Sequence, residues 1–228
     1  MTTPTLTRLQ SLMTGDEKHS AASTSTLDVI WVLYDRVLNV SPATVDDPDR
    51  DRFLLSKGHG PVSFYAVLAA KGFLDGIDPA GIGAFDSPLG FHPDRSLIPG
   101  VEIASGSLGH GLGIGVGVAL GLRAQGRLTP RTWVLLGDAE LDEGSNHEAI
   151  PYAGATGLDS LAVVVIDNQS STYGWPGGIA SRFAVNGWAT ETVDGRDHEA
   201  LYRAFTAPHP GRPYAVVATV EAKDSADA

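Results

Sequence analysis

The sequence predicts an α/β domain in which a mostly parallel sheet is flanked by helices. Three continuous apolar runs, "TWVLLGD", "LAVVVIDN" and "YAVVATV", are typical of strands buried on both faces. Segments with helical character, "NHEAIPYAGATG" and "DHEALYRAFTA", lie between these runs. This alternation of strands and helices favours a parallel sheet, and ligands of such sheets bind beyond the carboxyl ends of the strands.

The N-terminal part of the chain is predicted to be helical. Between about residues 5 and 40, apolar side chains recur at helical spacing, with an expected buried stripe of Leu27, Ile30, Trp31, Leu33 and Tyr34. Two prolines and a run of charge in "NVSPATVDDPDRDR" end this region. A second helix is predicted for "PVSFYAVLAAKGFL", because Pro61 suits a first turn and Gly72 a helix end.

A long loop and a glycine-rich helix follow. The stretch from Gly76 to Gly100 is rich in Gly and Pro, and long loops in compact domains are often functional. A helix is expected from Gly106 to Arg123, although the glycines at 111, 113, 115 and 117 each cost about 1 kcal/mol relative to alanine. We therefore expect this helix to pack its backbone closely against another helix, a partner subunit or a cofactor.

Composition restricts the class of protein. The 228 residues are 43% hydrophobic and 19% charged, which is typical of a soluble globular protein, and one domain is expected over residues 1–228. The net charge of -11 disfavours nucleic acid and anionic membranes as partners. The absence of cysteine excludes disulfides and Cys-ligated zinc. Without a recognisable signal peptide or membrane span, a cytoplasmic location is expected.

Two of the apolar runs end in oxygen-bearing side chains, Asp138 and Asn168. If both runs are neighbouring parallel strands, these side chains come close together at one edge of the sheet. Carboxylate and amide oxygens suit Mg²⁺ or Ca²⁺, whose shell is often completed by ligand phosphates and water. Gly137 would let a ligand approach the backbone. The structural alternative is that Asp138 caps a helix and Asn168 forms an Asx-turn.

Acidic residues and histidines provide further candidates. Glu140, Asp142 and Glu143 either complement a helix N-terminus or include a buried proton relay. Four histidines lie in loops beside small residues: His19, His59, His92 and His110. A single loop histidine is more often a solvent-exposed residue, but together the four are candidates for one polar site. His147 and His198 fall on helical segments and are interpreted as surface residues.

Together, these motifs resemble the N-terminal, diphosphate-binding half of transketolase, in the form in which that half is a separate subunit. The motifs "SKGHG", "HPD", "PGVE", "GSLGHG", "GDAELDEGSNHEA" and "IDN" occur in the order of that family. The stretch "RFAVNGWATETVDGRDHEAL" resembles the segment that follows them. The resemblance covers roughly residues 8 to 220 and implies a thiamine-diphosphate-binding fold.

The resemblance also implies a set of cofactor-binding residues. A divalent metal, Mg²⁺ or Ca²⁺, would be held by Asp138, Asn168 and the backbone carbonyl of Ser170. The thiamine diphosphate itself would be lined by these two metal-binding side chains together with His59, Gly106, Leu108, Gly137 and Ala139. Ala139 stands where the family has a glycine, and it keeps the backbone N–H but disfavours a positive φ.

Four residues are implied to take part in catalysis: His19, His59, His92 and Glu143. The histidines would contact the diphosphate or the substrate and carry protons, and Glu143 would join a proton network across a subunit interface. The implied reaction transfers a two-carbon ketol unit from a ketose to an aldehyde acceptor, with the carbanion chemistry supplied by the cofactor. The chain lacks the basic segment that relatives use near a substrate phosphate, so a phosphorylated sugar is not implied.

A partner polypeptide is implied as well. The family binds its cofactor between this domain and a pyrimidine-binding domain, for which 228 residues leave no room. We therefore expect a C-terminal transketolase-like subunit, an α2β2 assembly, and no activity of this chain alone. Two alternatives stay open: the α subunit of a 2-oxoacid dehydrogenase-like enzyme that passes an acyl group to a carrier, and a non-catalytic subunit that has kept the fold.

Overall fold

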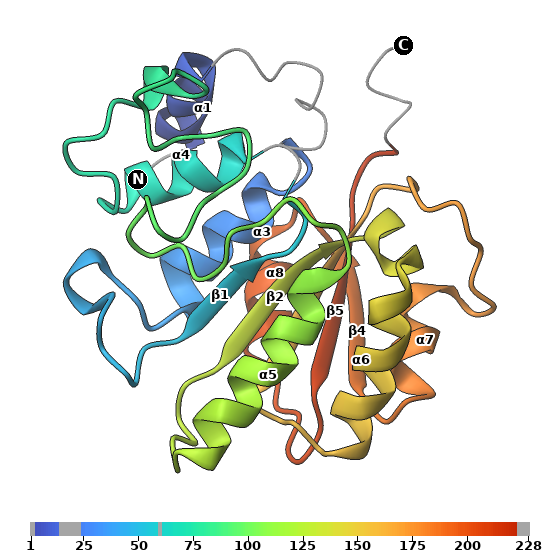
Figure 1. Cartoon of the computed structure of the whole chain (residues 1–228). Coiled ribbons are helices and arrows are strands. Elements are labelled where there is room, and N and C mark those ends of the chain that lie inside the picture. The colour runs from blue at the N-terminus through green and yellow to red at the C-terminus, as the bar shows by residue number, and fades with distance from the viewer. Residues whose placement is uncertain (1–2, 14–23, 59–60, 223–228) are drawn as a thin grey trace.

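Five parallel strands form the centre of the molecule, in the order β1-β2-β3-β5-β4 (Figure 1). The computed structural model describes residues 3–13, 24–58 and 61–222. The strands are β1 (Arg52–Leu55), β2 (Thr132–Gly137), β3 (Leu161–Asp167), β4 (Ala189–Asp194) and β5 (Tyr214–Thr219). A parallel sheet flanked by helices confirms the predicted α/β class.

The three apolar runs of the sequence form the three central strands, as predicted. Every residue of β2 is buried, and β3 is buried up to its last residue. The sequence signals neither β1, which has only four residues and follows a charged segment, nor β4. Because β4 lies at the edge of the sheet and is partly exposed, its sequence "ATETVD" lacks the continuous apolar pattern of a central strand.

Helices cover both faces of the sheet (Figure 1). The helices α5 (His110–Ala124), α6 (Gly144–Ala155) and α7 (Gly178–Ala184) pack on one face, and α3 (Leu27–Val32) and α8 (His198–Phe205) pack on the other. The chain moves across the sheet in one direction from β1 to β4 and returns from β4 to β5. Because crossovers between parallel strands are right-handed, the returning helix α8 lies on the face opposite α5, α6 and α7.

The predicted N-terminal helix is divided in the structure. Its parts are α1 (Thr3–Leu12), which packs against α4 (Val62–Ala70), and α3, which continues into the π-helical turn η2 (Leu33–Val37). The expected stripe is buried from Ile30 to Tyr34, and Leu27 is partly buried against the core. Short 3-10 helices are η3 (Pro42–Thr44), η4 (Pro79–Gly81) and η5 (Ala139–Asp142). No helix in the described part of the chain is both long and apolar enough to cross a bilayer.

The glycine-rich helix α5 begins at His110 instead of the predicted Gly106, because Gly106 and Gly109 have left-handed φ angles of 121° and 82°. A Cβ atom on Gly115 would collide with Val134 of β2, so the expected close packing is present, but here against the sheet, which was not among the expected partners. A Cβ atom on Gly117, in contrast, would meet nothing within 4 Å. The two faces of α5 therefore need glycine to different degrees.

Candidate functional site

The carboxyl ends of the central strands meet at one edge of the sheet. Strand pairing places Gly137 of β2 beside Ile166 of β3, and the backbone N–H of Asp138 donates to the carbonyl of Ile166 at 3.0 Å. Asp138 and Asn168 therefore follow neighbouring strands at similar levels. The loops after β1, β2 and β3 together form the candidate site.

The buried carboxylate of Asp138 holds the loop that follows β3. Its Oδ2 accepts from the backbone N–H groups of Ser170 at 2.7 Å and Ser171 at 3.2 Å. Its Oδ1 accepts from Ser170 Oγ at 2.6 Å and from the N–H of Ala139 at 2.8 Å. Asp138 is also the N-cap of η5, so the expected capping role is present together with the contact to Ser170.

Asn168 presents a buried oxygen acceptor without a partner. The residue is 6% exposed, and its Oδ1 accepts no hydrogen bond from any residue that the structure describes, so it does not form the alternative Asx-turn. The following residue, Gln169, has a φ of 58°, which is uncommon for a residue with a side chain. A buried, unpaired amide oxygen is costly unless an ion or ligand satisfies it, and it suits a hard cation.

Ala139 fits its position without backbone strain. It is the first residue of η5, and Gln169 is the only non-glycine residue with a positive φ among the described residues. The expected difficulty of an alanine at a glycine position therefore does not arise from φ here. Close by, the side chain of Lys57 lies over Gly137, where an added Cβ would be 3.3 Å from Lys57 Cδ.

Of the three acidic residues after β2, only Glu140 is buried, at 1% exposed. Its Oε1 accepts from Ser56 Oγ and from the N–H of Gly109 at 2.9 Å, and its Oε2 accepts from the N–H of Gly137 at 3.3 Å. Burial raises the pKa of Glu140, while these hydrogen bonds and the charge of Lys57 oppose the rise. We call Glu140 and its three donors the Glu140 network; it joins the ends of β1 and β2 to the start of α5.

The loop after β1 and the loop before α5 approach each other through glycines. A Cβ on Gly58 would lie 2.5 Å from the backbone nitrogen of Gly106, and a Cβ on Gly106 would lie 3.0 Å from Cγ of His92. The Nδ1 atom of His92 is 3.1 Å from the carbonyl oxygen of Gly58. Because a carbonyl only accepts, Nδ1 carries the proton, and Nε2 is the acceptor of the neutral ring.

The other predicted residues lie at the periphery or outside the described chain. Leu108, His110 and Glu143 are exposed, and Glu143 is the N-cap of α6. His19 and His59 fall outside the described residues. Within the described ranges, no group of three or more His, Asp or Glu side chains could hold a metal ion. A cation at Asp138 would therefore need amide, backbone or ligand oxygens.

The sequence did not single out Ser56 and Lys57, which follow β1 directly. Both are buried, and Ser56 Oγ also accepts from the N–H of Gly111 at 3.0 Å. The only available signal was their place next to the glycines of "SKGHG". Of the two histidines interpreted as surface residues, His147 is exposed, whereas His198 is half-buried and its Nε2 lies 2.7 Å from Asp28 Oδ1.

Comparison with known proteins identifies the family of this chain. The family described as "Transketolase, thiamine diphosphate binding domain" matches residues 7–220. The chain is 33% identical over 207 residues to one subunit of the apulose-4-phosphate transketolase of Actinobacillus succinogenes, covering 88% of this chain and 75% of that protein. It is 57% identical over 215 residues to "Ferredoxin fas2" of Rhodococcoides fascians, covering 94% of this chain and 71% of that protein. These 228 residues contain no cysteine, so they carry no thiolate ligand for an iron–sulfur cluster.

Solved transketolase structures share the fold. The enzyme of Leishmania mexicana superposes with a TM-score of 0.73 at 27% identity, covering 91% of this chain and 37% of that one. The enzyme of Campylobacter jejuni superposes with a TM-score of 0.76 at 25% identity, covering 96% of this chain and 38% of that one. This chain thus spans little more than a third of the length of these solved enzymes. It belongs to the transketolase family, as the N-terminal domain that binds thiamine diphosphate.

Proposed function

We propose that this chain is the diphosphate-binding subunit of a split transketolase-like enzyme, which transfers a two-carbon ketol unit from a ketose to an aldehyde acceptor. Asp138, Asn168 and the backbone carbonyl of Ser170 would hold a divalent metal, Mg²⁺ or Ca²⁺, on the diphosphate. Gly106, Leu108, Gly137 and Ala139 would line the cofactor with His59. Bound thiamine diphosphate would supply the carbanion chemistry.

The observation that carries the proposal is the unpaired Oδ1 of Asn168. Asn168 lies two residues before Ser170, which the Asp138 carboxylate binds, so this buried amide oxygen belongs to the same loop that the carboxylate holds. Mg²⁺ is typically bound by one or two protein groups together with phosphates and water. The donor set therefore fits a cation that is gripped jointly by the chain and by a diphosphate.

Positions in the structure support the proposed roles of two of the four catalytic residues, His92 and Glu143. His92 is held by the carbonyl of Gly58, so its neutral ring has Nε2 as the acceptor for a substrate hydroxyl proton. His19 and His59 are proposed to contact substrate and diphosphate by family resemblance alone. Glu143 is exposed at the start of α6, which suits a group that meets a partner subunit.

A partner chain is part of the proposal. Relatives from Actinobacillus succinogenes and Phocaeicola vulgatus are each named as one subunit of apulose-4-phosphate transketolase, which supports a second subunit. We propose a C-terminal transketolase-like subunit with the pyrimidine-binding domain, in an α2β2 assembly, and no turnover by this chain alone. The comparisons give no better support to a 2-oxoacid dehydrogenase-like subunit, and the unstrained Ala139 removes the main reason to favour a non-catalytic one.

Asn168→Ala provides the test. Within the described chain the Oδ1 of Asn168 accepts no hydrogen bond, so the loss of this oxygen should leave the unliganded fold intact. Thermal unfolding and titration calorimetry would compare this variant, the parent and the exposed control Asp159→Asn, each with the partner subunit, Mg²⁺ and thiamine diphosphate. Cofactor at a hundred times its Kd should stabilise the parent and the control by about 2.7 kcal/mol. Equal stabilisation of Asn168→Ala would overturn the assigned site, and ketol transfer without the partner would overturn the split enzyme.

A further inference from the structure

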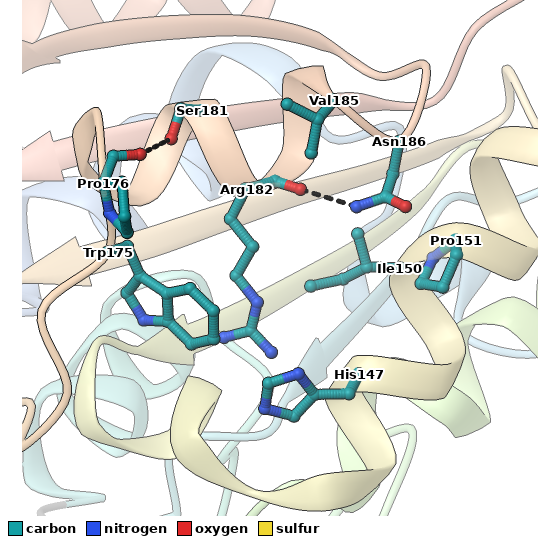
Figure 2. A pocket seen from close by; sticks show the side chains of 9 residues that line it. All are labelled: His147, Ile150, Pro151, Trp175, Pro176, Ser181, Arg182, Val185 and Asn186. Atoms are coloured by element: carbon teal, nitrogen blue, oxygen red, sulfur yellow. Dashed lines mark hydrogen bonds between the residues drawn. The ribbon is translucent and has the colours of Figure 1, made fainter.

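A cavity lies between α6 and α7, closed on one side by the loop that precedes α7 (Figure 2). Its volume is about 320 Å³, at the lower end of the range of small-molecule sites. The apolar wall is formed by Ile150, Pro151 and Val185, and the polar part by Arg182 and Asn186. None of the residues assigned above to metal, cofactor or catalysis lines this α6–α7 cavity.

The guanidinium of Arg182 is buried in the wall of the cavity with one donor unused. The residue is 7% exposed, its Nη1 donates to the carbonyl of Leu141 at 2.6 Å, and its Cζ lies 4.0 Å from the centre of the Trp175 ring. Its Nη2 is buried and has no acceptor among the described residues. A buried donor without an acceptor costs free energy, and more so when the group is charged. The fold therefore tolerates a cost at this position that a bound acceptor would remove.

The charge of Arg182 is also left without a direct counterion. Arg36 pairs with Glu199 and Arg196 with Glu221, whereas no carboxylate of the described chain lies within ion-pair distance of Arg182. Burial lowers the pKa of Arg182, and the charge of Asp142 opposes this. The Asp142 oxygens, however, accept from Ser171 Oγ and the N–H of Thr172 instead of from Arg182.

The cavity thus combines an unused cationic donor with an apolar wall. The lining residue Trp175 also has a buried donor without an acceptor, its Nε1, and no lining side chain in the described ranges has a buried acceptor that lacks a donor. An excess of donors selects an acceptor group, and a guanidinium selects a negatively charged one. The ring of Trp175 lies against the guanidinium and also contacts the ring of His147, with the two ring centres 5.4 Å apart (Figure 2). Because the guanidinium is planar, a planar carboxylate is its best-matched acceptor.

We propose that the α6–α7 cavity binds a small carboxylic acid, with the carboxylate at Nη2 of Arg182 and a short branched or aromatic body against Ile150, Pro151 and Val185. A cavity of about 150 Å³ can hold a benzene ring, so a volume of about 320 Å³ has room for a carboxylate with a body of that size. The site is separate from the proposed cofactor site and does not depend on it. It would be occupied in the absence of thiamine diphosphate.

The probes are benzoate and 3-methylbutanoate, with benzamide as the neutral control of the same shape. The full chain, labelled with ¹⁵N, gives one indole resonance for each of its four tryptophans, and Trp175→Phe identifies the resonance of Trp175. Both acids should shift this resonance saturably in the millimolar range. Benzamide should bind at least about tenfold more weakly, because it loses the charge-assisted hydrogen bond to Arg182.

Two variants keep the test decisive. Arg182→Lys keeps the charge but loses the second guanidinium donor, and should weaken benzoate at least about tenfold. If that variant does not fold, Val185→Trp provides the test, because this residue is 81% exposed and a larger side chain there fills the cavity and should abolish binding. The control Leu128→Trp, at a residue that is 74% exposed and lies outside the cavity, should leave binding unchanged. No saturable shift, equal binding of benzamide, or undiminished binding by Val185→Trp would overturn the proposal. So would Arg182-dependent capture of the partner subunit without any binding of the free acids, since the cavity would then belong to a protein side chain.

Discussion

The Glu140 network offers the sharpest test of how the loops of the site are held together. Glu140 accepts three hydrogen bonds, from Ser56 Oγ and from the N–H groups of Gly109 and Gly137. These donors come from the end of β1, the start of α5 and the end of β2. Glu140→Gln changes one oxygen to an amide with the same shape, so it tests the hydrogen bonds and not the packing.

The magnitude follows from the donors that Gln cannot satisfy. Its remaining oxygen can accept from Ser56 and Gly109, but its NH₂ group then faces the N–H of Gly137, so both donors lack an acceptor in a buried place. Each such group costs about 1–3 kcal/mol. The loss of a buried negative charge, whose burial raises the pKa of Glu140, offsets part of this cost. We expect a net loss of about 1–3 kcal/mol in the free energy of unfolding, or about 2–4 °C in Tm for each kcal/mol.

Urea unfolding of the full chain measures this loss. The matched control is Glu148→Gln, an identical change at an exposed position of α6, which should stay within about 0.5 kcal/mol of the parent. A double-mutant cycle with Ser56→Ala should give a coupling energy of about 0.5–3 kcal/mol, because Ser56 and Glu140 are in contact. If Glu140→Gln unfolds at the same urea concentration as Glu148→Gln, or if the coupling is zero, Glu140 does not hold these loops together.

Two further predictions concern α5 and the amino end of the sheet. Gly115→Ala should destabilise the fold by about 1–3 kcal/mol, because the added Cβ would collide with Val134. Gly117→Ala should stabilise it by about 0.5–1 kcal/mol, because the added Cβ would meet nothing within 4 Å. Equal urea midpoints for the two variants would refute the assignment of the two helix faces. Burial lowers the pKa of His209, whose Nε2 accepts from Arg131 Nη2 at 3.0 Å, so protonation would break this bond and place two cations together. The stability that neutral His209 contributes should therefore be fully present above its ordinary pKa of 6.5, and it should be lost as the pH falls through the lowered pKa of His209 in the folded protein. A curve of stability against pH for His209→Gln should lack this decline.

The sequence by itself determined the fold class and the three central strands. Continuous apolar runs are a local signal, because a strand covered on both faces needs an apolar side chain at each position, and β2, β3 and β5 carry that signal. The edge strands β1 and β4 do not, since their pairing is decided by neighbours far away in the chain. The break at Gly106 and Gly109 was also hidden, because a glycine in a helical pattern does not reveal its φ.

At the site, residue type and spacing placed Asp138 and Asn168 at strand ends but left the three acidic residues after β2 equivalent, and only the family resemblance singled out Glu143. Only the tertiary structure separated these residues, by burying Glu140 among donors from three segments while Glu143 stayed exposed. It likewise brought Ser56 to Glu140 and left Nη2 of Arg182 without an acceptor in the described chain, beside the α6–α7 cavity. Residue type and strand position can be predicted from the local sequence. Burial and hydrogen-bond partners depend on which distant segments pack together, and they determine which carboxylate or guanidinium is available to bind a ligand.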